Sequence, residues 1–331
     1  MCNEIDIRED YIAREYSPEV LNLLLIDHGR RRGDRTDGHD HIIWATNSYQ
    51  RLGERYGFHL PITADLITGQ AGRVIMPRVA KSCDVQQERV RDRAEVFTPA
   101  WVCNAQNNLV DEAWFGRKNV FNTPSGITWV STADPIVFPE GRTWKDYVAD
   151  LRLEISCGEA PYLTSRYDAA TGQPLPVGER VGLFDRKLRV VNENTATTGQ
   201  WLAAAQWALK STYGFEWQGD SLLIARENLL FSFVDAYKAK FGSKPQLRSV
   251  CYAAYIISWN LVQMDGLKFV VPESCHDDQQ LDLFGVAAQA PCPGCAKDSS
   301  RLHNGVHTIV RDWHRRPKER QIVEFMQLLK Q

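Results

Sequence analysis

Residues 151–163 read LRLEISCGEAPYL, and residues 214–230 read GFEWQGDSLLIARENLL. The first stretch alternates apolar and polar residues and then turns at Gly158, which is typical of a strand followed by a loop. Between the two stretches, TGQWLAAAQWALKSTYG (198–214) is rich in alanine and predicts a helix that ends at Gly214. The order strand, helix, strand favours parallel pairing of the two strands and therefore an α/β fold.

Two more helices and a strand continue this pattern. Residues 221–242 and 247–263 predict helices, and LKFVVP (267–272) predicts a strand. In open α/β sheets, ligands bind at the carboxyl ends of strands beside a glycine-bearing turn, because backbone N–H groups can approach them there. Gly158 is therefore a candidate ligand-binding residue, and Glu216 is a candidate for holding a ribose. An ordinary loop with one glycine is the alternative interpretation.

The composition is that of a folded globular protein. Of the 331 residues, 44% are hydrophobic and 24% are charged, and the net charge is −2. Such a balance gives no overall basic field, so contact with nucleic acid has to come from local clusters such as RDWHRRPKER (311–320), for which solvated surface charge is the alternative. No signal segment opens the sequence, and the most apolar window (250–262) is too short to span a bilayer. We therefore expect a soluble, cytoplasmic protein.

Three stretches resemble consecutive motifs of the amino-DNA methyltransferases of restriction-modification systems: AEVFTP (94–99), EISCGEAPYL (154–163) and GFEWQGDSLLIARENLL (214–230). Over most of its length the chain resembles bacterial restriction endonuclease subunit M-like proteins. This resemblance implies a Rossmann-like, S-adenosylmethionine-dependent methyltransferase sheet over 94–272, after an N-terminal accessory region over 1–93. It also implies methylation of double-stranded DNA, at N6 of adenine, with a restriction or specificity subunit as a further partner.

The resemblance further implies a cofactor site for S-adenosylmethionine. Its residues are Phe97, Thr98 and Pro99 against the methionine end, Glu154 and Gly158 in the glycine turn, Glu216 on the ribose and Asp265 near the adenine. The second glycine of the family's turn is Ala160 here, followed by Pro161, which puts a methyl group and a fixed φ where the backbone should approach the cofactor. For Asp265, a helix-terminal turn with Gly266 is the alternative.

Amino-methylation also requires a base pocket. An Asn or Asp accepts hydrogen bonds from the target amine, and an aromatic ring stacks on the flipped base. The family signature, Asn/Asp-Pro-Pro-aromatic, does not follow residue 216. HIIWATNSY (41–49) predicts a strand followed by Asn47 and Tyr49, which are the catalytic candidates if the motifs are circularly permuted. The alternatives are a surface asparagine with a packed tyrosine, and a non-catalytic cofactor- or DNA-binding subunit.

Residues 164–196 lengthen the connection between the first strand and its helix. ATGQPLPVGER (170–180) has turn chemistry, and LRVV (188–191) predicts a strand. Long insertions of this kind often contact substrate. Four arginines, at 166, 180, 186 and 189, are candidates for phosphate contacts, and solvated loop charges are the alternative.

The C-terminal region, 273–331, concentrates cysteine and histidine. A CxxC turn that contains glycine points both sulfurs at one ion, as tetrahedral zinc requires. The predicted ligands are Cys275, Cys292, Cys295 and His303. His276 and His307 are possible substitutes for the histidine ligand. We expect a structural zinc ion that holds a small, loop-rich tail without a core of its own, since no thioredoxin-like context favours a redox role.

Overall fold

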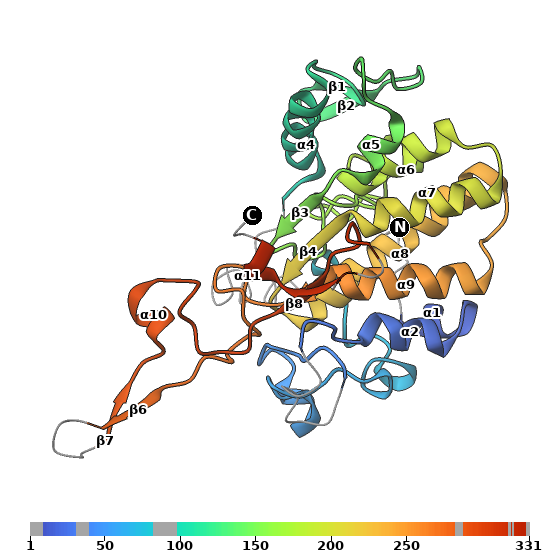
Figure 1. The fold of residues 1–331 in the computed structure, drawn as a ribbon. Helices are drawn as coiled ribbons and strands as arrows, with labels where there is room; N and C mark the ends of the chain where they lie inside the picture. Colours follow the sequence, from blue (N-terminus) through green and yellow to red (C-terminus); the bar gives the residue numbers. More distant parts are fainter. Residues whose placement is uncertain are drawn as a thin grey trace.

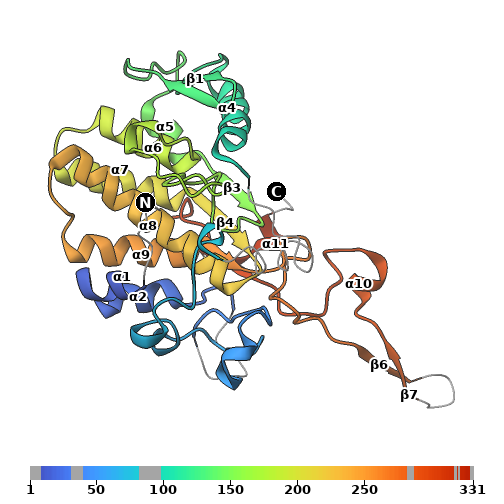
Figure 2. The same ribbon diagram turned by 180° about the vertical axis from the view of Figure 1, so that it is seen from behind.

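The computed structural model describes residues 9–30, 40–81, 98–281, 287–316, 319 and 321–328. Helices surround a small sheet, and an arm that carries α10, β6 and β7 projects away from this body in both views (Figures 1 and 2). The helix α4 and the hairpin β1–β2 lie together at another edge of the body, at the top of the view of Figure 1. The mixed α/β class predicted from the sequence is confirmed.

A parallel three-stranded sheet, in the order β3–β4–β5, positions the candidate site. Its strands are β3 (Arg152–Ile155), β4 (Thr212–Glu216) and β5 (Leu261–Gln263). Glu154 pairs with Gly214, and Glu216 pairs with Gln263. Because all three strands run the same way, their carboxyl ends meet at one edge, as the order of elements predicted.

The remaining strands form three antiparallel pairs. They are β1 (Asn122–Ser125) with β2 (Thr128–Ser131), β6 (Asp278–Leu281) with β7 (Ala287–Ala290), and β8 (Ile309–Arg311) with β9 (Ile322–Glu324). A cluster of apolar side chains joins the last pair to the sheet, with Phe215 and Val262 packed against Val310, Val323 and Phe325. The chain therefore returns from the arm to the body before it ends.

Ten α-helices are described. They are α1 (Glu9–Glu15), α2 (Pro18–Leu25), α4 (Ala100–Phe115), α5 (Trp144–Ala149), α6 (Leu183–Asn194), α7 (Thr198–Lys210), α8 (Gly219–Phe241), α9 (Leu247–Asn260), α10 (Pro293–Lys297) and α11 (Phe325–Leu328). Short 3-10 turns lie at Gln50–Leu52, Glu54–Tyr56, Ala64–Leu66, Gly69–Ala71, Arg78–Ala80 and Val177–Glu179. Helix α8 is buried along most of its length and contacts both β4 and β5. It is the centre of the main core, which explains why its sequence is apolar on several faces.

Three strand predictions are wrong. Residues 267–272 form turns, in which Val270 makes only an isolated bridge with His307, and β5 instead follows α9 directly. Residues 41–46 are extended but make only isolated bridges. The run LRVV belongs to α6, where packing against α7 and α8 overrides the β preference of its valines.

Candidate functional site

The structure brings Gly158 and Glu216 into direct contact at the carboxyl edge of the sheet. The backbone N–H of Gly158 donates to Glu216 Oε2 at 2.7 Å, and the N–H of Gln218 donates to Oε1 at 3.0 Å. Gly158 has a φ of 54°, a left-handed conformation in which glycine is the least strained residue. The turn after β3 and the turn after β4 are thus joined through one carboxylate, at the edge where parallel sheets bind ligands.

Burial controls the ionisation of this carboxylate. Glu216 is only 7% exposed, and burial raises its pKa to about 7, against the lowering effect of the Gln218 and Gly158 N–H groups. Each of the two carboxylate oxygens accepts one of these hydrogen bonds, and an oxygen with two lone pairs can accept a second. The group can therefore change its charge near neutral pH while it still has sites for hydroxyl donors.

The residues before α4 lie next to the same turn. A hydrogen bond from Thr98 lowers the pKa of Tyr162, although burial raises it overall, so Thr98 and the glycine turn are in contact. Pro99 precedes the first residue of α4, and the N–H of Ala100 donates to Asp168 Oδ2 at 2.6 Å. Two of the three resembled motifs therefore meet here, and Phe97 lies outside the described residues.

Glu154 and Ala160 serve the internal structure of the turn. The Glu154 carboxylate accepts from the N–H groups of Leu163 at 3.2 Å and Tyr162 at 3.4 Å, and burial raises its pKa well above the usual range. Ala160 has a φ of 63° and a fully buried side chain in the main core. It keeps the left-handed conformation that the family's glycine would adopt, and its methyl group packs into the protein interior.

Asp265 forms the turn that was the alternative interpretation. Its Oδ1 accepts from the N–H groups of Leu267 at 2.9 Å and Lys268 at 3.0 Å. The neighbouring Gly266 lies so close to the end of β3 that a Cβ there would be 2.7 Å from Ile155 Cγ2. The turn is therefore beside the candidate site, with one carboxylate oxygen committed to its own backbone.

Asn47 and Tyr49 have different environments. Asn47 is exposed, whereas Tyr49 is buried, with its ring 4.8 Å from that of Trp44 and its hydroxyl donating to Asp220 Oδ2 at 2.7 Å. Asp220 also pairs with Lys81, at 3.3 Å. These side chains match the alternative of a surface asparagine and a packed tyrosine, and a stacking role for Tyr49 stays a prediction.

Residues 41–49, which contain Asn47 and Tyr49, are nevertheless held by hydrogen bonds at the carboxyl edge of the sheet. The side chain of Gln263 bonds both the N–H and the carbonyl of Ile43, at 2.9 and 2.8 Å. The Gly219 N–H donates to the Trp44 carbonyl at 3.0 Å, and a Cβ on Gly219 would lie 2.0 Å from the Ile43 oxygen. The sequence analysis did not single out Gln263, Gly219 or Asp220; the one available signal was the acid in the first turn of a predicted helix.

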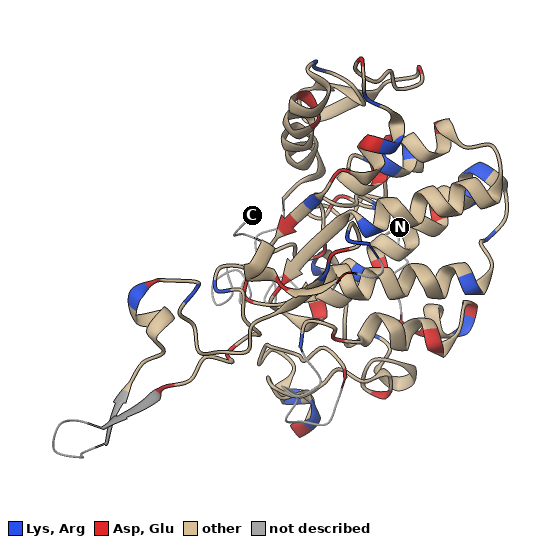
Figure 3. Cartoon of the chain, viewed as in Figure 1, with Lys and Arg blue, Asp and Glu red and all other residues tan. Residues whose placement is uncertain are grey.

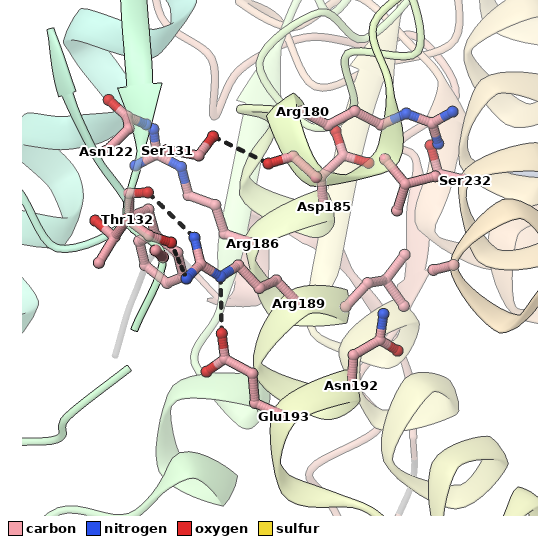
Figure 4. Close-up of a pocket in the computed structure, with 16 residues that line it drawn as sticks. Asn122, Ser131, Thr132, Arg180, Asp185, Arg186, Arg189, Asn192, Glu193 and Ser232 are labelled. Carbon is pink, nitrogen blue, oxygen red and sulfur yellow. Dashed lines mark hydrogen bonds and ion pairs between the residues drawn. The ribbon is translucent and has the colours of Figure 1, made fainter. Parts of the chain in front are cut away.

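The four arginines of 164–196 are not free for phosphate contacts in this structure. Arg166 and Arg180 both pair with Asp235, and Arg186 is buried against Asp111. Figure 4 shows Arg189 between Glu193 and the Thr132 carbonyl, beside a pocket of about 290 Å³. Both earlier interpretations, phosphate contacts and solvated loop charges, are replaced by partly or fully buried ion pairs.

The predicted metal ligands come together in the arm. One ligand atom from each of Cys275, Cys292, Cys295 and His303 lies within 4.8 Å of the others. His303 Nδ1 is 3.5 Å from the sulfurs of Cys275 and Cys292 and 3.7 Å from that of Cys295. A tetrahedral zinc ion, with Zn–S of about 2.3 Å and Zn–N of about 2.0 Å, separates such atoms by about 3.6 Å. The cluster has the composition and spacing of a metal centre.

Gly294 and several N–H groups shape this cluster. A Cβ on Gly294 would lie 2.5 Å from both the backbone nitrogen and Nδ1 of His303, so only glycine lets the CxxC turn approach the ring. Burial would raise the pKa of Cys292, but the N–H groups of Asn304, Cys295 and Gly294 and the His303 ring bring it down to about 6. These donors favour a thiolate, the form that binds metal.

Comparisons with protein-family models, with curated proteins and with solved structures found no match. The site therefore has to be interpreted from its own geometry. Among the described helices, none combines the length and the apolar character needed to cross a membrane.

Proposed function

We propose that the protein is an S-adenosylmethionine-dependent DNA methyltransferase, acting on N6 of adenine in a restriction-modification or defence setting. The observation that carries this proposal is the hydrogen bond between Gly158 and Glu216 at the carboxyl ends of adjacent parallel strands. Thr98 lies beside the same turn, so two of the resembled motifs, together with the acid of the third, meet where a nucleoside cofactor binds in such sheets.

The charge of this edge suits the cofactor. S-adenosylmethionine carries a positive sulfonium group, and Glu216, whose pKa is raised to about 7, is an acid of this edge that is negatively charged above neutral pH. The ribose hydroxyls would donate to the remaining acceptor sites of Glu216, and the backbone of the Gly158 turn would lie against the cofactor. When bound, the cofactor supplies an activated methyl group.

We further propose that the Cys/His cluster binds one structural zinc ion. Three thiolates and one imidazole are a typical ligand set for structural zinc, and of the apolar side chains that are described between residues 273 and 307, only Cys292 is buried. Metal analysis of the purified protein should find about one equivalent of zinc, reduced to background in Cys292→Ser. The absence of metal from the freshly purified wild type would contradict this assignment.

A second function is favoured by the state of Tyr49. Its ring lies in the core and its hydroxyl bonds Asp220, and no Asn-Pro-Pro-aromatic signature follows residue 216. A non-catalytic subunit that binds the cofactor or DNA would need the Gly158–Glu216 edge but no base pocket. The two functions differ in methyl transfer and share cofactor binding.

Calorimetric titration with S-adenosylmethionine tests the shared step. Glu216→Gln should weaken binding about tenfold or more, since it removes a charged acceptor, while Glu112→Gln, near the end of α4, should leave it unchanged. Wild-type affinity should be higher at about pH 8 than at about pH 6, because Glu216 ionises with a pKa near 7.

A methyl-transfer assay on mixed-sequence DNA then separates the two functions. Transfer lost in Asn47→Ala with cofactor binding intact would favour the enzyme. Cofactor binding without transfer to any DNA would favour the non-catalytic subunit. A wild-type protein that binds no S-adenosylmethionine would refute the enzyme and the cofactor-binding form of the second function.

A further inference from the structure

A surface of aromatic rings and cations lies away from the candidate site. Lys210, the last residue of α7, lies two residues before the start of β4, so this surface is at the amino end of that strand, whereas Gly158 and Glu216 are at the carboxyl edge. The surface is formed by α7, α9 and the residues after β8: Trp207, Lys210, Arg248, Tyr252, Tyr255, Arg311, Trp313 and His314. We call it the aromatic-basic surface.

Two of its rings are left open to solvent. Trp207 is 42% exposed and Tyr252 is 37% exposed. Tyr252 stacks on Tyr255 with an interplanar angle of 17°, and the ring of Trp207 lies 5.7 Å from that of His314. Large aromatic side chains that stay exposed next to each other present flat faces on which a further planar group can stack.

Lys210 lies at the centre of these rings. Its Nζ is 5.2 Å from the centroid of Trp207, 5.4 Å from that of Tyr252 and 5.3 Å from that of Trp313. None of the hydrogen bonds or ion pairs found among the described residues involves this half-buried ammonium group, which has three N–H donors. The rings hold the charge in place by cation–π attraction and leave its donors available to an anion.

More positive charge surrounds this centre. Arg311 lies 4.1 Å over the ring of Trp313, Arg248 is exposed one turn before Tyr252, and His314 follows in the same basic segment. Asp312, the acid next to Arg311, is paired with Arg315 at 3.0 Å. Lys and Arg are elsewhere interspersed with Asp and Glu in the view of Figure 3, and the net charge is −2, so this attraction is local.

From this arrangement we infer that the aromatic-basic surface binds single-stranded nucleic acid, with unpaired bases stacked on Trp207 and Tyr252 and a phosphate held by Lys210. Single-strand-binding surfaces combine these two features, because every base has a face for stacking and every nucleotide carries one negative charge. A duplex offers the phosphates but hides the base faces. The inference does not rest on the proposed methyltransferase function.

The test is fluorescence anisotropy with a labelled oligothymidylate and with a labelled duplex, on the full chain at several salt concentrations. The wild type should bind the single strand more tightly than the duplex. Trp207→Ala and Tyr252→Ala should each weaken single-strand binding by between about fivefold and a hundredfold. Trp101→Ala is the matched control, because Trp101 is 41% exposed but lies on α4.

Charge and stacking are tested separately. In Lys210→Gln, the slope of log affinity against log salt should become shallower by about 0.7, the value for one phosphate contact on a single strand. Trp207→Phe keeps a ring and should retain most of the affinity, which separates stacking from misfolding. Equal binding of duplex and single strand, ring variants that bind like Trp101→Ala, or no binding of oligothymidylate at low salt would each overturn the inference.

Discussion

Two buried acids, Glu9 on α1 and Glu227 on α8, lie near enough to influence each other's charge, and neither forms a salt bridge within the part of the chain that the structure describes. Neither oxygen of Glu227 has a hydrogen-bond partner in the described structure, and both residues are almost fully buried. Burial raises the pKa of Glu9 to about 8 and raises that of Glu227 well above its usual range. The charge of Glu9 raises the pKa of Glu227 further, whereas the charge of Arg166 lowers it. At neutral pH the pair is therefore at least partly protonated.

This pair should make the protein less stable in alkali. Between these pH values the folded state holds protons that the unfolded chain, with a glutamate pKa near 4.5, has released. The contribution of these protons to the free energy of unfolding is therefore complete below pH 4.5 and is lost as pH rises through about 8. One such proton gives a slope of at most about 1.4 kcal/mol per pH unit. Urea unfolding between about pH 5 and pH 9 should show this decline in the wild type.

Glu9→Gln should flatten the decline, because an amide cannot ionise and can donate to Glu227. Glu19→Gln, which changes an exposed acid of α2, should leave the slope as in the wild type. If all three proteins lost stability equally between these pH values, the acids would not be the cause.

At the scale of single elements, the local signals of the sequence predicted helices well. Ser17 and Pro18, a typical cap and first helical residue, begin α2, with the Ser17 hydroxyl accepting from the Glu19 N–H at 2.9 Å, and Gly242 ends α8 in a left-handed conformation. Caps of this kind depend on neighbouring residues, so they can be recognised without a fold.

Elements defined by tertiary contacts were not predictable in the same way. Helix α6 contains the buried Lys187, whose ammonium donates to the carbonyls of Asp150 and Ser211 from distant parts of the chain. Nothing in its local sequence shows those acceptors. The short strand β5 was likewise missed, since its three residues follow α9 without a turn signal. The CxxC spacing, in contrast, predicted which cysteines and histidine come together.

A single substitution in the turn between Cys292 and Cys295 can test whether the Cys/His cluster binds metal. Gly294→Ala would place a Cβ about 2.5 Å from His303, which is closer than atoms can pack, so the turn or the ring has to move. We expect this variant to lose its metal on purification. Gly178→Ala is the control, since no atom lies within 4 Å of the added Cβ; a variant at 294 that kept a full equivalent of metal would show that His303 is not a ligand.

On the scale of the whole molecule, the candidate site is assembled from segments far apart in the sequence. Residues 41–49, the turn at Gly158 and the ends of β4 and β5 meet at one edge through Gln263, Glu216 and Gly219. The sequence motifs predicted the contact between Gly158 and Glu216, but the side of the sheet on which 41–49 docks depends on the complete fold. The arm lies outside this assembly (Figure 1).

The arm is attached to the body on both sides of the metal cluster. Before it, Val270 bridges to His307, and after it Tyr213 donates to the Arg311 carbonyl and Trp313 to Asn260, at 2.8 and 2.7 Å. The core of the body, built around α8, contains none of the four ligands. Loss of the metal should therefore disorder the arm and leave the body folded, because the two depend on different interactions.

Limited proteolysis with and without a chelator tests this separation. Chelation should open cleavage sites between Cys275 and His303, while the two fragments remain associated through β8 and its contacts with α9 and Tyr213. Thermal unfolding of the body, followed by the fluorescence of its buried tryptophans, should shift by no more than a few degrees, since its core packing is untouched. Cysteine variants should be cleaved without chelator at the same positions. Collapse of the whole protein on chelation would instead mean that the metal stabilises the body, and that the arm and the body fold as one unit.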